Sequence, residues 1–241
     1  MIIKPHTIKY LLIFLTFLFG LYSCRETNKY PEIRKMGYEY FPIKTGAWIE
    51  YEVEHIKIDA PSQVFDTIRY KLREYITEKL PDSITGQRFK IERFILKKDS
   101  WDIKDVWWVE KSKTNVVVNE ENILKVKQVY PLESRSEWNG NSLNTLEKEQ
   151  YKVIGLDLKD TIKTKLFDSV LTVEQKNFES LFEKKYKAEK YAKNIGMVYS
   201  KFIQIESQSS STYQIDISKP IMTRITKGEI ITIYYASHNK K

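Results

Sequence analysis

Apolar and polar residues alternate along most of the chain after residue 38. In the stretch IEYEVE at 49–54, every second residue is apolar and every other one is glutamate. Such alternation is typical of a β-strand with one buried face. Ile56 and Ile58 continue on the opposite parity, which predicts a bulge or a bend near His55.

The alternation returns in two neighbouring segments, 67–78 and 87–98, on either side of the turn-forming sequence PDSITG. This arrangement predicts a β-hairpin. Its inward-facing residues are predicted to be Ile68, Tyr70, Leu72, Ile76, Phe89, Ile91 and Ile95. Further strands are predicted at 106–110, 115–118, 123–130, 150–154, 168–174, 197–205, 213–217 and 229–235.

One segment departs from this period. Residues 177–187 carry large apolar side chains at helical spacing, which predicts a short helix, although a strand fits nearly as well. The chain is therefore expected to be mainly β: a curved antiparallel sheet or barrel of about ten strands with at most one short helix. We assign it to a single β-rich domain at 39–237, followed by a tail at 238–241.

The first residues carry a different pattern. Lys4 and Lys9 precede the apolar run LLIFLTFLFGLY at 11–22, which is too short for the roughly 20 residues that span a bilayer. Ser23 and Cys24, the only cysteine, follow directly. Such a leader is typical of a cleaved signal peptide.

Leu21-Tyr22-Ser23-Cys24 resembles the bacterial lipobox, in which the thiol is acylated (for example with palmitate) and the leader is cut before the cysteine. The resemblance implies a signal peptide at 1–23 and a tether at 24–38 that hangs from a membrane through lipidated Cys24. The alternatives are an ordinary secretory leader with a chance cysteine and an uncleaved apolar helix. A lipidated Cys24 places the protein in the bacterial cell envelope, on the outer membrane, and a tether poor in acids favours the periplasmic side over the cell surface.

Charge excludes one class of partner. The formal net charge is +8, but Lys and Arg are interleaved with Glu and Asp throughout the chain. A nucleic-acid-binding protein would concentrate its basic residues in one patch. We therefore expect no nucleic-acid partner.

Three segments resemble uncharacterised lipoproteins of Bacteroidota. YFPIKTGAWIEY at 40–51 resembles their YFPLxxGxxWxY-type opening, WNGN at 138–141 resembles their WxGN loop, and EKYAKNIGMVY at 189–199 is similar to their late ExYAxxxGxV segment. Here one residue, rather than two, separates Gly46 from Trp48. The resemblance implies a secreted, lipid-anchored β domain and brings no activity or catalytic residues.

The residue inventory disfavours several chemistries. After the leader only His55 and His238 remain as histidines, and no G-x-S-x-G elbow is present. Zinc needs several His or Cys ligands, and the chain after the leader supplies too few of them. It also contains no glycine-rich loop of the kind that binds phosphate. We expect no catalytic residue of these classes, no metal and no cofactor.

Carboxylates are plentiful, so a two-acid glycosidase stays open. Asp99, Asp102 and Asp105 recur at three-residue spacing beside Trp107 and could form a sugar or calcium site. The spacing lacks the alternate ligands and the glycine of a calcium loop, and a polar hairpin tip beside core tryptophans is favoured.

Trp138 lies with Asn139 and Asn141 in the longest predicted loop, 131–144. A tryptophan among polar residues can stack on a ligand or lie at an interface, and Trp107 could do the same. The favoured alternative is a loop folded back to plug the barrel.

Two hypotheses of different class follow. The leading one is a non-enzymatic envelope lipoprotein that binds an envelope protein, an apolar ligand or a glycan, or serves as a scaffold. The alternative is a carbohydrate-active enzyme that uses paired carboxylates.

Overall fold

The computed structural model describes residues 35–209 and 214–239, so the predicted leader, Cys24 and most of the tether lie outside the described residues. The described chain forms twelve strands and two short 3-10 helices, η1 (Tyr38–Tyr40) and η2 (Ile221–Thr223). The strands are β1 (Trp48–Asp59), β2 (Val64–Leu80), β3 (Gly86–Lys97), β4 (Ser100–Ser112), β5 (Asn115–Glu120), β6 (Ile123–Val129), β7 (Glu137–Asn139), β8 (Gln150–Ile162), β9 (Lys165–Glu179), β10 (Glu183–Ala192), β11 (Gly196–Glu206) and β12 (Lys227–His238). These ranges hold no helix with the length and apolarity needed to cross a membrane.

All twelve strands belong to one antiparallel sheet, in the order β6-β5-β4-β3-β2-β1-β12-β11-β10-β9-β8-β7. Strands β1–β6 form one meander and β7–β12 form a second, and the pairing of β1 with β12 joins the two. The prediction of a mainly β antiparallel sheet or barrel is confirmed, with twelve strands in place of about ten.

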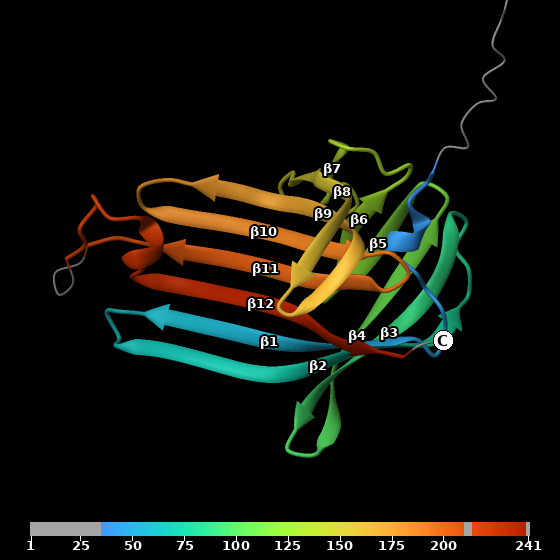
Figure 1. The fold of residues 1–241 in the computed structure, drawn as a ribbon, viewed down its shortest axis with the longest axis horizontal. Helices are drawn as coiled ribbons and strands as arrows, with labels where there is room; N and C mark the ends of the chain where they lie inside the picture. Colours follow the sequence, from blue (N-terminus) through green and yellow to red (C-terminus); the bar gives the residue numbers. More distant parts are fainter. Residues whose placement is uncertain (1–34, 210–213, 240–241) are drawn as a thin grey trace, which may run out of the picture. The chain divides into compact units, whose positions relative to one another are not determined.

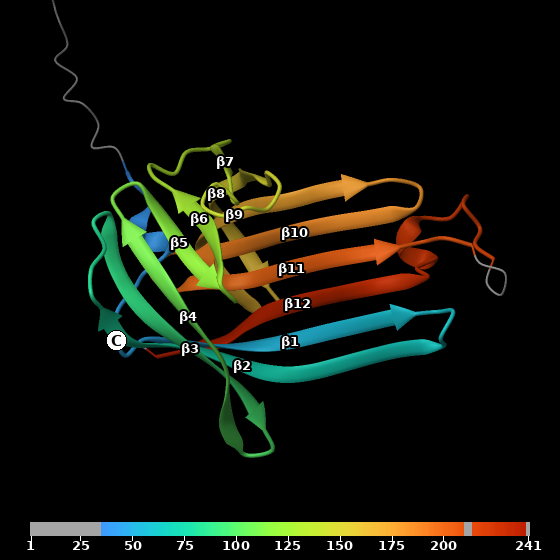
Figure 2. The same ribbon diagram turned by 180° about the vertical axis from the view of Figure 1, so that it is seen from behind.

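The two edges of the sheet, β6 and β7, meet at a seam that nearly closes a barrel. The Val126 amide donates to the Gly140 carbonyl at 3.0 Å, and the Val126 carbonyl accepts the Trp138 indole N–H at 2.8 Å. Figures 1 and 2 show the curl of β3–β8, beyond which β1, β2 and β9–β12 continue side by side as an open layer.

The alternation in β1 decides which face is buried. Tyr51 and Val53 are buried, whereas Glu50 and Glu54 point to the opposite face and form ion pairs there, with Arg69 at 2.6 Å from Glu54. The inner face of β1 is therefore stabilised by apolar packing, and its outer face by ion pairs.

The main core fills the barrel and takes side chains from both meanders. Its buried residues are Tyr40, Phe89, Ile91, Val109, Val116, Val117, Val118, Val126, Tyr130, Leu132, Trp138, Tyr151, Val153, Leu171, Val173 and Tyr191.

The bulge predicted near His55 is wrong. The register of β1 shifts against β12 between Glu50 and Tyr51, and its pairing with β2 is regular throughout. Ile56 has the opposite parity because it packs on the other face, against the cluster that contains Ile221 of η2.

The helix predicted at 177–187 is also wrong: β9 continues to Glu179 and β10 starts at Glu183. Its apolar residues surround an exposed hairpin turn, because cross-strand pairing on both sides outweighs the helical spacing. The strand predicted at 213–217 is wrong as well, since 214–219 is irregular.

Candidate functional site

A cavity of about 310 Å³ lies against the inner wall of the sheet, and we call it the mouth pocket. It is formed by the stretches 41–51, 194–197 and 238–239, together with Glu74 and Ile76 of β2 and Ile91 of β3. Its volume is at the lower end of the range for small-molecule sites, about 300–1,000 Å³.

The stretch before β1 forms one wall because a tight turn fixes it on β2. Gly46 has a positive φ of 85°, a conformation that favours glycine. Its amide donates to the Ile76 carbonyl at 2.8 Å, and the Ile76 amide donates to the Ala47 carbonyl at 2.9 Å. Phe41, Ile43 and Ala47 are thereby held over the cavity.

The opposite wall comes from the β10–β11 turn and the end of β12. The Asn194 amide donates to the Glu39 carbonyl at 2.8 Å, which joins this turn to η1. The Asn239 side chain donates to the Gly46 carbonyl at 2.7 Å and accepts the Trp48 amide at 2.9 Å. Segments from both ends of the domain therefore close the same cavity.

Most of the lining is apolar, and one ionisable pair stands out against it. Glu74 and Tyr51 both line the pocket, and the Tyr51 hydroxyl lies 3.4 Å from one Glu74 carboxylate oxygen. The other oxygen accepts the Arg93 Nε–H at 3.1 Å. Arg93 also contacts both oxygens of Asp105 at 3.2 Å, and its guanidinium stacks 3.6 Å from the Trp107 ring centroid. We call Glu74, Arg93 and Asp105 the Arg93 cluster.

Burial raises the pKa values of Glu74 and Tyr51. The Glu74 side chain is 21% exposed, and burial raises the pKa of its carboxyl although Arg93 acts in the opposite direction. Burial, aided by the Glu74 charge, raises the pKa of the Tyr51 phenol well above its usual value. The tyrosine is therefore neutral, and Glu74 holds its proton more strongly than a free glutamate does.

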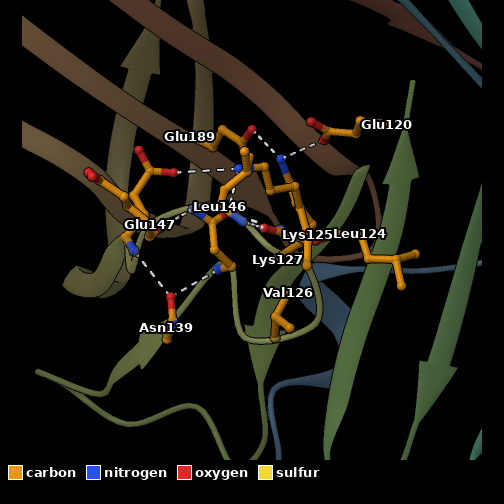
Figure 3. A network of polar contacts seen from close by, with 12 residues as sticks. Glu120, Leu124, Lys125, Val126, Lys127, Asn139, Leu146, Glu147 and Glu189 are labelled. Atoms are coloured by element: carbon orange, nitrogen blue, oxygen red, sulfur yellow. Dashed lines mark hydrogen bonds and ion pairs between the residues drawn. The ribbon is translucent and has the colours of Figure 1, made fainter. Parts of the chain in front are cut away.

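A second cluster lies deeper in the barrel. Figure 3 shows Lys127 of β6 between Glu120 of β5 and Glu189 of β10, with Nζ–O distances of 2.9 and 2.5 Å. The Tyr191 hydroxyl donates to Glu189. We call these four residues the Lys127 cluster. Burial acts to lower the pKa of Lys127, but Glu120 and Glu189 outweigh it and raise that pKa well above the ordinary value.

A larger groove of about 530 Å³ follows the outer face of β1 and β2. Its lining is charged, and its acids are already paired, Glu52 with Lys163 and Glu54 with Arg69. It is also the more open of the two cavities. The mouth pocket is less open and has fewer charged side chains in its lining, so we take it as the candidate site.

The residues singled out in the sequence lie elsewhere. Trp138 is 8% exposed and binds Val126 at the seam, and Trp107 lies beneath Arg93. Asn139 accepts backbone amides at 3.0 and 3.1 Å, and Asn141 accepts Lys125 Nζ at 2.5 Å. These asparagine contacts hold the loop after β7 together.

The three aspartates of 99–105 do not meet. Asp102 pairs with Lys97 at 3.4 Å, whereas Asp105 belongs to the Arg93 cluster. Within 35–209 and 214–239, no group of three His, Cys, Asp or Glu side chains is arranged to hold a metal ion. His55 is paired with Glu229 at 2.7 Å.

Sequence reasoning missed Glu74 and Arg93, although a signal was present. Glu74 interrupts the inward series between Leu72 and Ile76, and Arg93 interrupts the next strand in the same way. The two residues are register partners across the β2–β3 hairpin. Opposite charges at paired inward positions indicate a buried ion pair.

No family model matches the chain, and no curated protein matches it. The solved structures that align with it include two from Bacteroidales. One, from Bacteroides fragilis, is assigned as an exported protein with a YmcC-like fold: identity is 11%, the alignment covers 83% of this chain and 98% of that one, and the TM-score is 0.45. The other, from Parabacteroides distasonis, is assigned as a lipoprotein: identity is 10%, coverage is 80% and 96%, and the TM-score is 0.37.

Proposed function

We propose that this chain is a lipid-anchored protein of the bacterial cell envelope whose β domain is a non-enzymatic binding module for an apolar ligand. The observation that carries the proposal is the mouth pocket, a partly open cavity whose lining residues are mainly apolar. Cavities with this character are the usual sites of small-ligand binding.

The pocket also connects two of the segments that resemble the Bacteroidota lipoproteins. Phe41 and Trp48 belong to the first segment, and Asn194 and Met197 belong to the third, about 150 residues later in the chain. Their meeting at one cavity supports a shared binding role for these segments, and membership of that group is part of the proposal.

Filling the pocket tests the binding function. We choose the mature chain with Cys24→Ser, which keeps all twelve described strands and needs no detergent. Ala47→Phe adds a ring at the pocket wall and is expected to weaken binding of the neutral apolar dye Nile red at least tenfold in a fluorescence titration. Ala236→Phe makes the same change at an exposed position outside the pocket and is expected to leave binding unchanged.

Ile43→Ser is the second pocket variant, because it removes apolar lining without adding volume. Far-UV circular dichroism checks that each variant is folded. Wild-type dye affinity in both pocket variants, or no dye binding by the parent chain, contradicts the proposed function.

The anchor has its own test. Cys24→Ser in the full-length chain is expected to move the protein from the membrane pellet to the soluble fraction and to prevent labelling by a palmitate analogue. Such labelling of the wild-type chain, with protease protection in intact cells, would support an outer-membrane location facing the periplasm. A mutant that stays in the pellet with its leader uncut contradicts lipidation.

One observation favours the carbohydrate-active alternative. Burial raises the pKa of Glu74. At Glu120 burial acts in the same direction, but Lys127, Lys187 and Arg93 together outweigh it and lower the pKa of that carboxyl. Opposed shifts of this kind separate a general acid from a base. Release of reducing sugar from a glycan panel, lost in Glu74→Gln, would establish this alternative in place of the binding module.

A further inference from the structure

Glu74 is the one carboxylate among the described residues that line the mouth pocket. It lies on β2 beside Ile76, and its register partner on β1 is Ile49, which also lines the cavity. An apolar cavity with a single carboxylate in its wall distinguishes ligands by the polar group that they carry.

The two carboxylate oxygens of Glu74 differ in their hydrogen-bond partners. The oxygen that binds Arg93 Nε at 3.1 Å has a charge-assisted partner. The other has the Tyr51 hydroxyl at 3.4 Å, which is beyond the usual range for an O–H···O hydrogen bond. A carboxylate has about four acceptor positions, so this second oxygen can accept another donor.

Local charge favours a donor over an acid. Arg93 is shared between Glu74 and Asp105, and Lys104 pairs with Asp105 at 2.5 Å. Of these four side chains, only Glu74 lines the cavity. Glu120 repels the charge of Glu74 more strongly than Lys127 attracts it. A ligand carboxylate at this wall would be repelled and desolvated without compensation, whereas an ammonium or a hydroxyl would donate to the available oxygen.

The cationic groups of the pocket do not reverse this preference. Lys44 is exposed to solvent, and His238 shares a hydrogen bond of 2.7 Å with the Tyr235 hydroxyl. We propose that the mouth pocket selects apolar ligands with a hydrogen-bond-donating head group, an amine or a hydroxyl, which Glu74 receives. This inference rests on the proposed binding function and specifies its ligand class.

The test compares three ligands with the same eight-carbon chain and different heads: octylamine, octanol and octanoate. Isothermal titration calorimetry at pH 7 on the mature Cys24→Ser chain is expected to give the highest affinity for octylamine, then octanol. Octanoate is expected to bind at least tenfold more weakly than octylamine.

Glu74→Gln removes the charge and keeps the shape. It is expected to weaken octylamine binding about tenfold and to bring octanoate within threefold of octanol, because the repulsive charge is gone. Glu92→Gln is the matched control: Glu92 lies on β3, pairs with Lys90 at 3.1 Å and does not line the pocket. It is expected to leave all three affinities unchanged.

The ligand order in the wild-type chain requires no variant to fold. Octanoate binding as tightly as octylamine, or an unchanged ratio of octylamine affinity to octanoate affinity in a folded Glu74→Gln variant, overturns the ligand class while Nile red binding still supports the pocket. If neither the dye nor any of the three ligands binds, the proposed function fails together with this inference.

Discussion

The barrel contains two buried ion clusters that differ in one respect. In the Lys127 cluster, Lys127 and Glu189 are 7% and 6% exposed and Glu120 is 23% exposed, but none of the three lines a described cavity. In the Arg93 cluster, Arg93 is buried and Glu74 is 21% exposed, much like Glu120, but Glu74 forms part of the mouth pocket. One cluster faces packed side chains, and the other faces a space that a ligand can enter.

This difference indicates which buried charges are structural and which are available for binding. Lys127 links β5, β6 and β10, strands from both meanders, close to the seam. Glu74 keeps an oxygen with only a distant donor. We therefore expect stability to depend mainly on Lys127 and ligand choice to depend on Glu74.

The largest expected effect comes from Lys127→Met. This change leaves the two carboxylates of Glu120 and Glu189 in the barrel without their cation. Loss of one partner from a buried ion pair typically costs about 3–5 kcal/mol, so urea unfolding should show a loss of that size. The control Lys152→Met removes an exposed lysine that lies 3.8 Å from Glu137 and should cost less than about 1 kcal/mol. Equal losses in the two variants would remove the distinction between a structural and a surface ion pair here.

The second effect concerns the seam beside the Lys127 cluster. Trp138→Phe keeps a ring but removes the N–H that binds the Val126 carbonyl, and leaving a buried acceptor unpaired costs about 1–3 kcal/mol. Trp101→Phe is the control, because that indole is only half-buried and contacts the Arg73 guanidinium 4.2 Å from its ring centroid. Unchanged stability with lost Nile red binding in Trp138→Phe would instead assign Trp138 to ligand contact.

The third effect is a pH dependence of stability that arises from Glu74 of the Arg93 cluster. Burial raises the pKa of Glu74 above its ordinary value of 4.5, so the folded chain binds this proton more tightly than the unfolded chain does. The free energy of unfolding should therefore fall as pH rises from about 4.5 through the raised pKa. Glu74→Gln should remove this component, so wild-type stability relative to the variant should be higher at pH 5 than at pH 7 in urea unfolding. An identical difference at both pH values contradicts the raised pKa.

The sequence predicted the strands of the sheet better than it predicted the Arg93 cluster and the mouth pocket. Alternation located most strands because a strand with one buried face must repeat every two residues, as in 49–54. It failed at 177–187, where apolar residues surround a hairpin turn. The β6–β7 seam could not be predicted because these strands lie at opposite edges of the sheet and meet through the Trp138 side chain in place of a regular strand pairing.

The same alternation contained the signal for Glu74 and Arg93, because each interrupts an inward series at a paired position. That signal predicts an ion pair but no cavity. The mouth pocket depends on the approach of 194–197 and Asn239 to Gly46, contacts between segments far apart in the chain. Local periodicity carries no information about such contacts.

The smallest effect comes from a third ion group, at the surface. Asp157 accepts hydrogen bonds from Tyr40 at 2.8 Å and Ser169 at 2.5 Å and pairs with Lys193, which joins η1 to β8 and β9. Lys193 first, and then Ser169, lower the pKa of Asp157 from 3.8 to about 2. Its side chain is 46% exposed, so solvent screening limits the stabilisation to about 0.5 kcal/mol or less.

Asp157→Asn tests this limit, because asparagine tolerates the positive φ of 58° at this position while losing the charge. A folded-state pKa below the unfolded value stabilises the protein above about pH 3.8, and this contribution disappears as pH falls to about 2. The variant should therefore be slightly less stable at pH 5 and should lose less stability than the wild type between pH 4 and 2, measured by thermal unfolding. A loss as large as that of Lys127→Met would show that exposure does not rank these ion groups.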